Sequence, residues 1–487
     1  MIVLGFMIPR MFLVNFGSEV NGVVSTINQI FTYLCLLEAG VGLATLQALY
    51  QPVASGNSEK INSILAATDR YYKRTGVVYA AFVLILAVGY SAFVKTSLSR
   101  ETVFLIILFC GVPNIVSYLE LAKWRLFLQA EGKNYILNNM ETSMYVLVSF
   151  GKILLLMFTH NIILVQFMQC VGTLIQVIYF ESYFQRHYTW LNLKAEPDYE
   201  SISQKSSVLI HQISGIIFNN TDVILLSVFC DFRIVSVYTT YNLFFTYIEK
   251  LITAITSGIT FSLGQMFHSD RKLFLEFHNA YETCYMVFAF TIYTLVGVFL
   301  LPFIRLYTAG VNDIDYIDFR LLLLFIAVNL LANGKLPSNQ VINFAEHFEQ
   351  TKNRAVTEAV INILTSVVAI HYWGIYGGLL GTIAALLYRG NDMIFYANHK
   401  ILKRSVFCTY RKWAVNAGVF LCLMKASFVL EQTQAGYISL FIQAGLCGII
   451  ILPLYVGVNF LLERKSFIFM WNYLKEVWRC RNNCTNE

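Results

Sequence analysis

The stretch Asn219-Asn220-Thr221-Asp222 places four polar residues inside an apolar run from Val208 to Cys230. The run is long enough to cross the hydrocarbon core of a bilayer, about 30 Å thick, as one helix. A carboxylate at that depth costs several kcal/mol unless it is neutralised, paired or hydrated. The stretch therefore predicts a membrane span that faces a hydrated interior, with the rest of the chain forming a shell around it.

The composition gives the same class. The chain has 487 residues, of which 57% are hydrophobic and 13% are charged, and its mean hydropathy is +0.59. An ordinary soluble domain carries about 25% charged residues, so we predict an all-α integral membrane protein. No P-loop, no H-E-x-x-H and no cluster of Cys and His is present. We therefore expect neither an enzyme nor a bound metal or cofactor, and no nucleic-acid partner.

Apolar runs of sufficient length predict about fourteen membrane-spanning helices. The tenth is interrupted by Asn333-Gly334-Lys335-Leu336-Pro337, which favours a break in that helix. The runs lie near residues 1–16, 23–50, 77–94, 103–122, 135–158, 162–184, 208–230, 234–263, 281–304, 319–344, 355–373, 376–398, 413–430 and 437–462.

The distribution of basic residues tests this topology. Alternate loops and the C-terminal tail hold 24 of the 35 Lys and Arg residues, as the positive-inside rule requires of cytoplasmic segments. Both termini are therefore predicted to be cytoplasmic. In the tail, apolar residues recur at helical spacing from Phe467 to Trp478 with basic residues opposite, which predicts an interfacial helix that favours anionic lipid.

A faint internal repeat divides the chain. The sequence from Phe16 resembles that from Phe229, at an offset of 213, and Lys133-Asn134 resembles Lys352-Asn353, at an offset of 219. Parallel repeats place a substrate site between two halves. We predict an N-terminal lobe at 1–184, a cytoplasmic linker at 185–207 that acts as a hinge, a C-terminal lobe at 208–399, two further spans in 400–462, and a tail at 463–487.

Charged side chains inside the predicted spans are the candidates for function. Those facing lipid would oppose insertion, so most must line a hydrated cavity or pair with one another. Pairing is a plain alternative for Arg389 with Asp392, which are (i, i+3) neighbours, and for the adjacent Glu249 and Lys250. Several basic side chains facing one cavity would instead bind an anion, Arg being best suited to phosphate. The embedded charges are Arg10, Glu38, Glu141, Lys152, Asp222, Glu249, Lys250, Lys335, Glu358, Arg389, Asp392 and Lys425.

Several motifs together resemble a known family, the bacterial polysaccharide flippases of the Wzx type. This family belongs to the superfamily of multidrug and toxin extruders and lipid II flippases. The resemblance covers nearly the whole chain. The segment ahead of the matching arginine is shorter here than in the family. The motifs are Arg10, Phe16-Gly17, Leu37-Glu38-Ala39-Gly40-Val41-Gly42, Ala48-Leu49-Tyr50-Gln51-Pro52-Val53-Ala54, Asn220-Thr221-Asp222-Val223-Ile224-Leu225-Leu226-Ser227 and Val235-Ser236-Val237-Tyr238-Thr239-Thr240-Tyr241.

The resemblance implies a V-shaped transporter with two six-helix lobes and two further helices in the bacterial inner membrane. It would move an undecaprenyl-pyrophosphate-linked oligosaccharide to the outer leaflet for O-antigen, capsule or exopolysaccharide assembly. Arg10 becomes the first candidate for the pyrophosphate, and Asp222 a candidate for coupling to H+ or Na+ or for gating. Glu38, Asn219 and Asn220 are further candidates for that role. A polysaccharide polymerase is an expected partner.

The residues themselves fit such a substrate. A lipid-linked glycan combines a diphosphate, a polar sugar chain and a polyprenyl tail, so its carrier needs a cationic and hydroxyl-rich interior. The candidates are Arg10, Lys152, Lys250, Lys335, Arg389, Tyr238, Tyr241 and Asn242. The alternatives are a cation-coupled multidrug exporter and a membrane polysaccharide polymerase. The polymerase would need a large outside loop, and the longest outside connector, near 305–318, is short and acidic.

Overall fold

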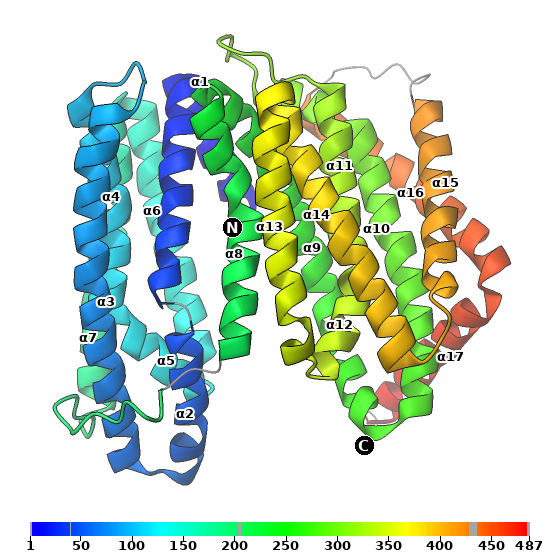
Figure 1. The fold of residues 1–487 in the computed structure, drawn as a ribbon, viewed down its shortest axis with the longest axis horizontal. Helices are drawn as coiled ribbons and strands as arrows, with labels where there is room; N and C mark the ends of the chain where they lie inside the picture. The colour runs from blue at the N-terminus through cyan, green and yellow to red at the C-terminus, as the bar shows by residue number, and fades with distance from the viewer. Residues whose placement is uncertain (1, 39, 203–205, 428–435, 485–487) are drawn as a thin grey trace. The chain divides into compact units, whose positions relative to one another are not determined.

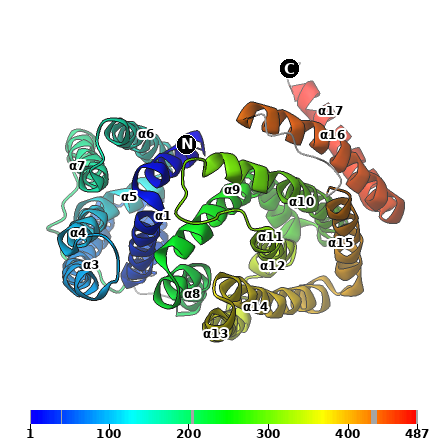
Figure 2. The same ribbon diagram turned by 90° about the horizontal axis from the view of Figure 1, so that it is seen from above.

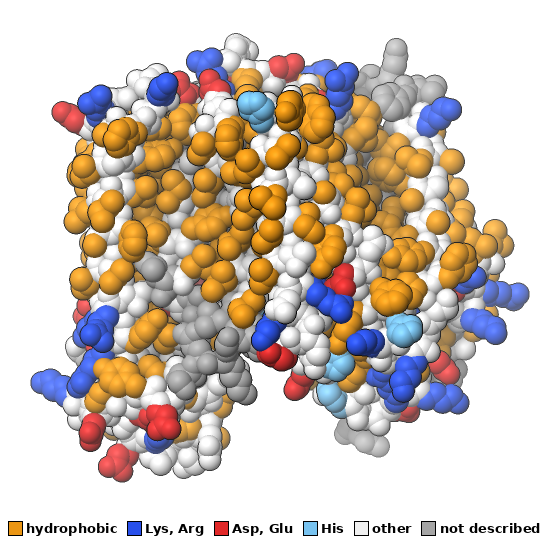
Figure 3. Space-filling view, in the orientation of Figure 1, with side chains coloured by type: hydrophobic (Ala, Val, Ile, Leu, Met, Phe, Trp, Pro, Cys, Tyr) orange, Lys and Arg blue, Asp and Glu red, His pale blue; other side chains and the backbone are white. Residues whose placement is uncertain are grey.

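The computed structural model describes residues 2–38, 40–202, 206–427 and 436–484, and this part of the chain is built almost entirely of helices (Figure 1). Ten of the described helices are long and apolar enough to cross a membrane. Figure 3 shows hydrophobic side chains along the sides of the helices, with Lys, Arg, Asp and Glu gathered towards their ends. The predicted all-α membrane fold is confirmed.

The chain forms two compact units. The first contains Met1–Thr239 and Gly310–Ile314, and the second Thr240–Ala309 and Asp315–Glu487. The helices of the first unit are α1 (Ile2–Leu34), η1 (Cys35–Glu38), α2 (Val41–Ser55), α3 (Ser58–Phe93), α4 (Arg100–Val116), η2 (Ser117–Leu121), α5 (Ala122–Ala130), α6 (Asn134–Phe158), α7 (Ile162–His187), α8 (Ser206–Phe229) and the start of α9 (Phe232–Ser269).

The second unit continues along α9. Its helices are α10 (Arg271–Tyr307), α11 (Phe319–Gly334), α12 (Leu336–Phe344), α13 (Phe348–Trp373), α14 (Ile375–Tyr396), η3 (Ala397–Leu402), α15 (Phe407–Ser427), α16 (Tyr437–Leu462) and α17 (Arg464–Cys484). The break predicted in the tenth span lies between α11 and α12, at Lys335. The predicted tail helix corresponds to α17, which packs against α10 through Phe277 and Tyr473.

The predicted continuous span at 23–50 is wrong. The helix that contains residue 23 is α1, which bends at Gly17 (φ 81°, ψ 176°) and ends at Leu34. A short 3-10 turn follows, and α2 begins after Gly40, which has φ 88°. Because a positive φ is accessible to glycine at little cost, Gly40 allows the chain to change direction inside an apolar run. Gly17 allows α1 to bend between the predicted runs 1–16 and 23–50, which the helix joins.

The repeat extends to helix boundaries. Ser58 of α3 and Arg271 of α10 are the first residues of matching helices and have the same offset as Phe16 and Phe229. Both helices start with a side-chain cap, Asn57 and Asp270. The larger offset derived from Lys352-Asn353 is wrong, because α6 begins at Asn134 whereas α13 begins at Phe348, one turn before Lys352.

Helices α13 and α14 pack most closely, side by side in Figure 2. A Cβ atom added to Gly377 would lie 2.2 Å from the backbone of Ala369, and one added to Gly381 would lie 2.2 Å from the hydroxyl of Ser366. This confirms the prediction that glycines allow these two helices to approach each other.

Candidate functional site

The predicted carboxylate of the seventh span is buried in the first unit. Asp222 of α8 is 6% exposed and accepts a hydrogen bond of 3.0 Å from the hydroxyl of Tyr238 on α9. The two helices are joined by a short turn, so the two side chains meet across an antiparallel helix pair. Of the predicted candidates, Asp222 and Tyr238 are thus brought together.

The other predicted coupling residues lie elsewhere in the first unit. Asn220 accepts a hydrogen bond from Gln29 of α1, and Asn219 is exposed. Glu38, in the turn after α1, accepts a hydrogen bond from Tyr72 of α3. Asn220 and Glu38 thus have their hydrogen-bond partners on α1 and α3.

The embedded cations of the first unit have different surroundings. Lys152 of α6 donates a hydrogen bond of 3.2 Å to the side-chain amide oxygen of Gln169 on α7. This acceptor is a neutral group. Arg10 lies half-buried on α1, about two turns before the bend at Gly17.

The second unit brings two predicted cations into one network. Lys335 lies at the break between α11 and α12, where Pro337 lacks the N–H that would continue the helix. Its ammonium group lies 2.8 Å from Glu358 of α13, and Arg389 of α14 lies 3.4 Å from the same carboxylate. Glu358 thus bridges cations from two other segments of the unit.

The network extends along α14. Arg389 is 3% exposed and forms the predicted (i, i+3) pair with Asp392, at 2.9 Å. Arg354 of α13 also binds Asp392. Together with Lys335 and Glu358, the ion pairs of this network in the described part of the chain join three cations to two carboxylates, one excess positive charge. The third cation, Arg354, is a third exposed and lies just before the predicted span 355–373, so the excess is at the end of the bundle, where it favours an anionic ligand.

The remaining candidates are separate from this network. Lys250 is exposed, lies 5.0 Å from the ring centroid of Tyr247, and in the described residues forms no ion pair with Glu249. Asn242 is exposed. Tyr241 is fully buried and donates a hydrogen bond of 2.8 Å to the backbone carbonyl of Tyr316, so it holds the segment that precedes α11.

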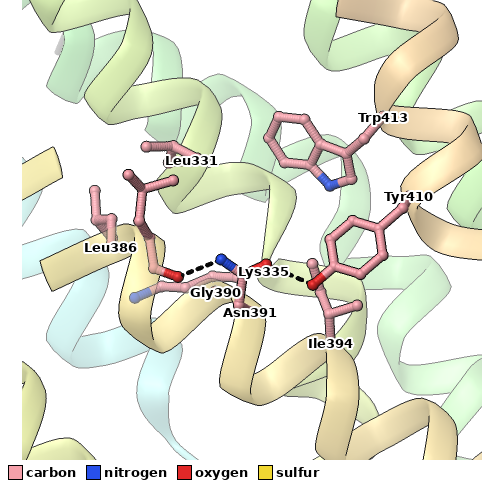
Figure 4. A pocket seen from close by; sticks show the side chains of 9 residues that line it. Leu331, Lys335, Leu386, Gly390, Asn391, Ile394, Tyr410 and Trp413 are labelled. Atoms are coloured by element: carbon pink, nitrogen blue, oxygen red, sulfur yellow. Dashed lines mark hydrogen bonds between the residues drawn. The ribbon is translucent and has the colours of Figure 1, made fainter. Parts of the chain in front are cut away.

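A small cavity adjoins the network. Its volume is about 190 Å³, and Figure 4 shows Lys335 on one side of it and Trp413 of α15 on the other. Most of its wall is apolar, apart from Lys335 and the hydrogen-bonded pair Asn391 and Tyr410. The lining residues are Leu331, Lys335, Leu386, Leu387, Gly390, Asn391, Ile394, Tyr410 and Trp413.

Two buried ion clusters were not predicted from the sequence. In the first unit, Lys123 lies 2.7 Å from Asp69. In the second, Glu282 of α10 binds Lys412 at 2.7 Å and Arg404 at 2.8 Å. The predicted spans end before Lys123 and Arg404 and begin after Lys412, so the sequence placed these three residues in cytoplasmic loops. The repeat could have revealed the acids, since Asp69 and Glu282 have the same offset as Phe16 and Phe229.

Solved structures share this arrangement of helices. The lipid II flippase MurJ in an inward closed conformation has a TM-score of 0.65 and 14% identity, covering 94% of this chain and 96% of its own. An inward-facing multidrug resistance MATE family transporter of the MOP superfamily has a TM-score of 0.62 and 12% identity, covering 84% and 96%. This chain shares its fold with these two transporters.

A third solved structure also shares this fold. The Vibrio cholerae MATE transporter VcmN in the bent form has a TM-score of 0.53 and 12% identity, covering 84% of this chain and 93% of its own. No family model and no curated protein matches the sequence. At these identities the likeness defines the fold of the chain, and its substrate has to be argued from the site.

Proposed function

We propose that this protein is a flippase for lipid-linked oligosaccharides, moving them from the cytoplasmic to the outer leaflet for surface polysaccharide assembly. The observation that carries the proposal is the excess of cations over carboxylates around Lys335, Arg354 and Arg389. The negative charge of a pyrophosphate would be attracted to that excess. An exporter of cationic drugs would need the opposite sign.

The comparisons support the same choice. The MurJ likeness covers a tenth more of the chain than the MATE likenesses do, about the combined length of α15 and α16. MurJ is a flippase of a lipid substrate, lipid II. The motifs at 10–61 and 219–245 resemble polysaccharide flippases, which narrows the proposed substrate to oligosaccharide repeat units.

Alternating access is the proposed mechanism, with lobes 1–184 and 208–399 moving about the linker at 185–207. The seam that would open joins α1 to α8, to the start of α9 and to the connector before α11, and side-chain hydrogen bonds cross it, among them the bond from Gln29 to Asn220. Asn21 donates a hydrogen bond of 2.7 Å to Ser236, and Ser18 donates one of 2.6 Å to Asp313. Hydrogen bonds of this kind contribute about 0.5–1.5 kcal/mol each, so they can be broken during transport.

The first experiment tests the substrate. Cells that lack the protein should lose surface polysaccharide and accumulate lipid-linked repeat units facing the cytoplasm. Lys335→Met should lower export by about tenfold or more, since a hydrogen bond to a charged group is worth about 1.5–3 kcal/mol. Lys272→Met, which removes an exposed lysine of α10, is the matched control and should export normally. Normal polysaccharide in deleted cells, with altered sensitivity to toxic cations, would favour the multidrug exporter instead.

The second experiment tests the seam. A short thiol cross-linker should join Asn21→Cys to Ser236→Cys, because the native side chains are in contact. Export should stop after cross-linking and return when the linker is cleaved. Uninterrupted export by the fully cross-linked protein would reject opening at this seam while leaving the substrate assignment untouched.

A further inference from the structure

The third helix of each half carries a buried carboxylate at the same repeat position. The offset between Asp69 of α3 and Glu282 of α10 equals the offset between the first residues of the two helices. In the first half, Asp69 is bound by Lys123, which follows the irregular turn η2. Asp69 also binds Lys73 of its own helix at 2.8 Å, so its partner from another helix is the lysine beside the irregularity of the next helical segment.

The second half also has a lysine beside such an irregularity, but the pairing differs. Lys335 lies at the break between α11 and α12 and binds Glu358 of α13. Glu282 is bound instead by Lys412 of α15 and by Arg404, which precedes it. Helix α15 lies beyond the repeat. Glu282 is therefore bound by Lys412 and Arg404 from a part of the chain that has no counterpart in the spans of the first half.

Glu282 faces the break where Lys335 lies. His278 and Tyr285 flank Glu282 by one turn on either side and therefore share its face of α10. His278 contacts the carbonyl oxygen of Pro337 at 3.3 Å, and Tyr285 donates a hydrogen bond of 3.2 Å to Asn333.

Helix α15 packs on the same break. Trp413 follows Lys412 and lies so close to Gly334 that an added Cβ atom would be 1.7 Å from the indole ring. Figure 4 shows Trp413 and Lys335 on opposite sides of the cavity. Lys412 and Lys335 thus approach one junction from two sides, with Glu282 beside it.

We infer that Lys412 is a positioning residue: by neutralising Glu282, it keeps Lys335 on Glu358 and so maintains the cationic network. Without Lys412, Glu282 would retain one cation, and Lys335 would be drawn to it as Lys123 is drawn to Asp69. The consequence for export rests on the proposed function, whereas the exchange of partners does not.

The test is a double-mutant cycle measured by thermal melting of the full-length protein. The melting-temperature shifts of Lys335→Met and Glu358→Gln should be non-additive in the parent, because the residues form an ion pair. In a Lys412→Met background, that non-additivity should fall to roughly half or less, and Lys335→Met should become coupled to Glu282→Gln. Unchanged coupling between Lys335 and Glu358 would overturn the inference.

Two controls keep the test decisive. Lys412→Arg preserves the charge and should leave the cycle as in the parent, and Lys412→Gln replaces Lys412→Met should the latter not fold. Export should fall in Lys412→Met and recover when Glu282→Gln is added. Loss of export that Glu282→Gln does not restore, in a protein that melts normally, would also reject the role of Lys412. Absence of glycan export in the parent would reject the proposed function alone, since the melting cycle needs no substrate.

Discussion

The third helix of the first half, α3, and its repeat counterpart, α10, have the same cap and a buried acid at the same position, but the two acids bind different cations. Both begin with a side-chain cap, and both bury an acid at the twelfth helical position. In α3 the acid binds Lys73 of the same helix and Lys123, both within the repeat, whereas in α10 it binds Lys412 and Arg404 from beyond it. Lys412 of α15, which lies outside the repeat, thus binds the acid of α10 while Lys335 binds Glu358.

The connectors that follow α7 and α14 also occupy matching places in the two halves but make different ion pairs. After α7, the chain returns to α3, where Asp198 binds Lys60. After α14, it returns to α10, where Arg404 binds Glu282. The first contact is at the surface and the second is buried, so the two should differ strongly in what they contribute to stability.

The largest expected effect is the removal of the acid from α10. Glu282→Leu leaves the buried Lys412 uncompensated and should lower the free energy of unfolding by about 3–5 kcal/mol. Asp69→Leu should cost roughly half as much, because Lys123 retains Glu120 at 3.7 Å. Thermal melting of both variants in one detergent checks the order. Equal shifts would show that the added cations do not distinguish the two halves.

The next effect concerns the contact of α15 with the broken helix. Gly334→Ala places a methyl group against Trp413 and should destabilise the protein by about 1–3 kcal/mol. Gly390→Ala, on the other side of the same cavity, meets no atom within 4 Å and should be neutral or stabilising, because alanine favours helix over glycine. Trp413→Leu should relieve Gly334→Ala. Equal melting temperatures for Gly334→Ala and Gly390→Ala would argue against close packing of α15.

The helix caps provide a smaller and more symmetric test. Asn57 accepts a hydrogen bond from the backbone N–H of Lys60, and Asp270 accepts from Lys272 and Leu273. Replacing either cap by alanine should cost about 1 kcal/mol. The loss at Asp270 should be a few tenths of a kcal/mol greater, because a negative charge also favours a helix N-terminus. Chemical denaturation measures both, and a larger loss at Asn57 would contradict the shared geometry.

Much of this fold was predictable because hydropathy and loop charge report directly on membrane insertion. The break at Lys335 was predictable from Gly334 and Pro337, whereas the turn at Gly40 was not, because the apolar pattern continues through it. At Gly17 the sequence predicted the end of a span, and the structure instead bends α1 there and continues it to Leu34. In the candidate site, the pair of Arg389 with Asp392 followed from spacing along one helix. The bridge through Glu358 depends on how three segments pack, which a single sequence does not encode locally.

The smallest effect is the pH dependence of the surface contact after α7. The Lys60 ammonium group, and then the Ser201 hydroxyl and backbone N–H, hold the pKa of Asp198 well below its usual range. A lowered pKa in the folded state stabilises the contact above the unfolded value, about 3.9, and the stability is lost as the pH falls below it.

The exposed pair should therefore contribute about 0.2–1 kcal/mol at neutral pH, and hydrogen exchange in residues 192–202 should increase below about pH 4. Exchange rates need correction for their intrinsic pH dependence. Asp198→Asn, which cannot ionise, should exchange faster at neutral pH and show no further change on acidification. Loss of protection at the same pH in Asp198→Asn would assign the transition to another group. The pair of Lys60 with Asp198 could then no longer be compared with the buried pair of Arg404 with Glu282.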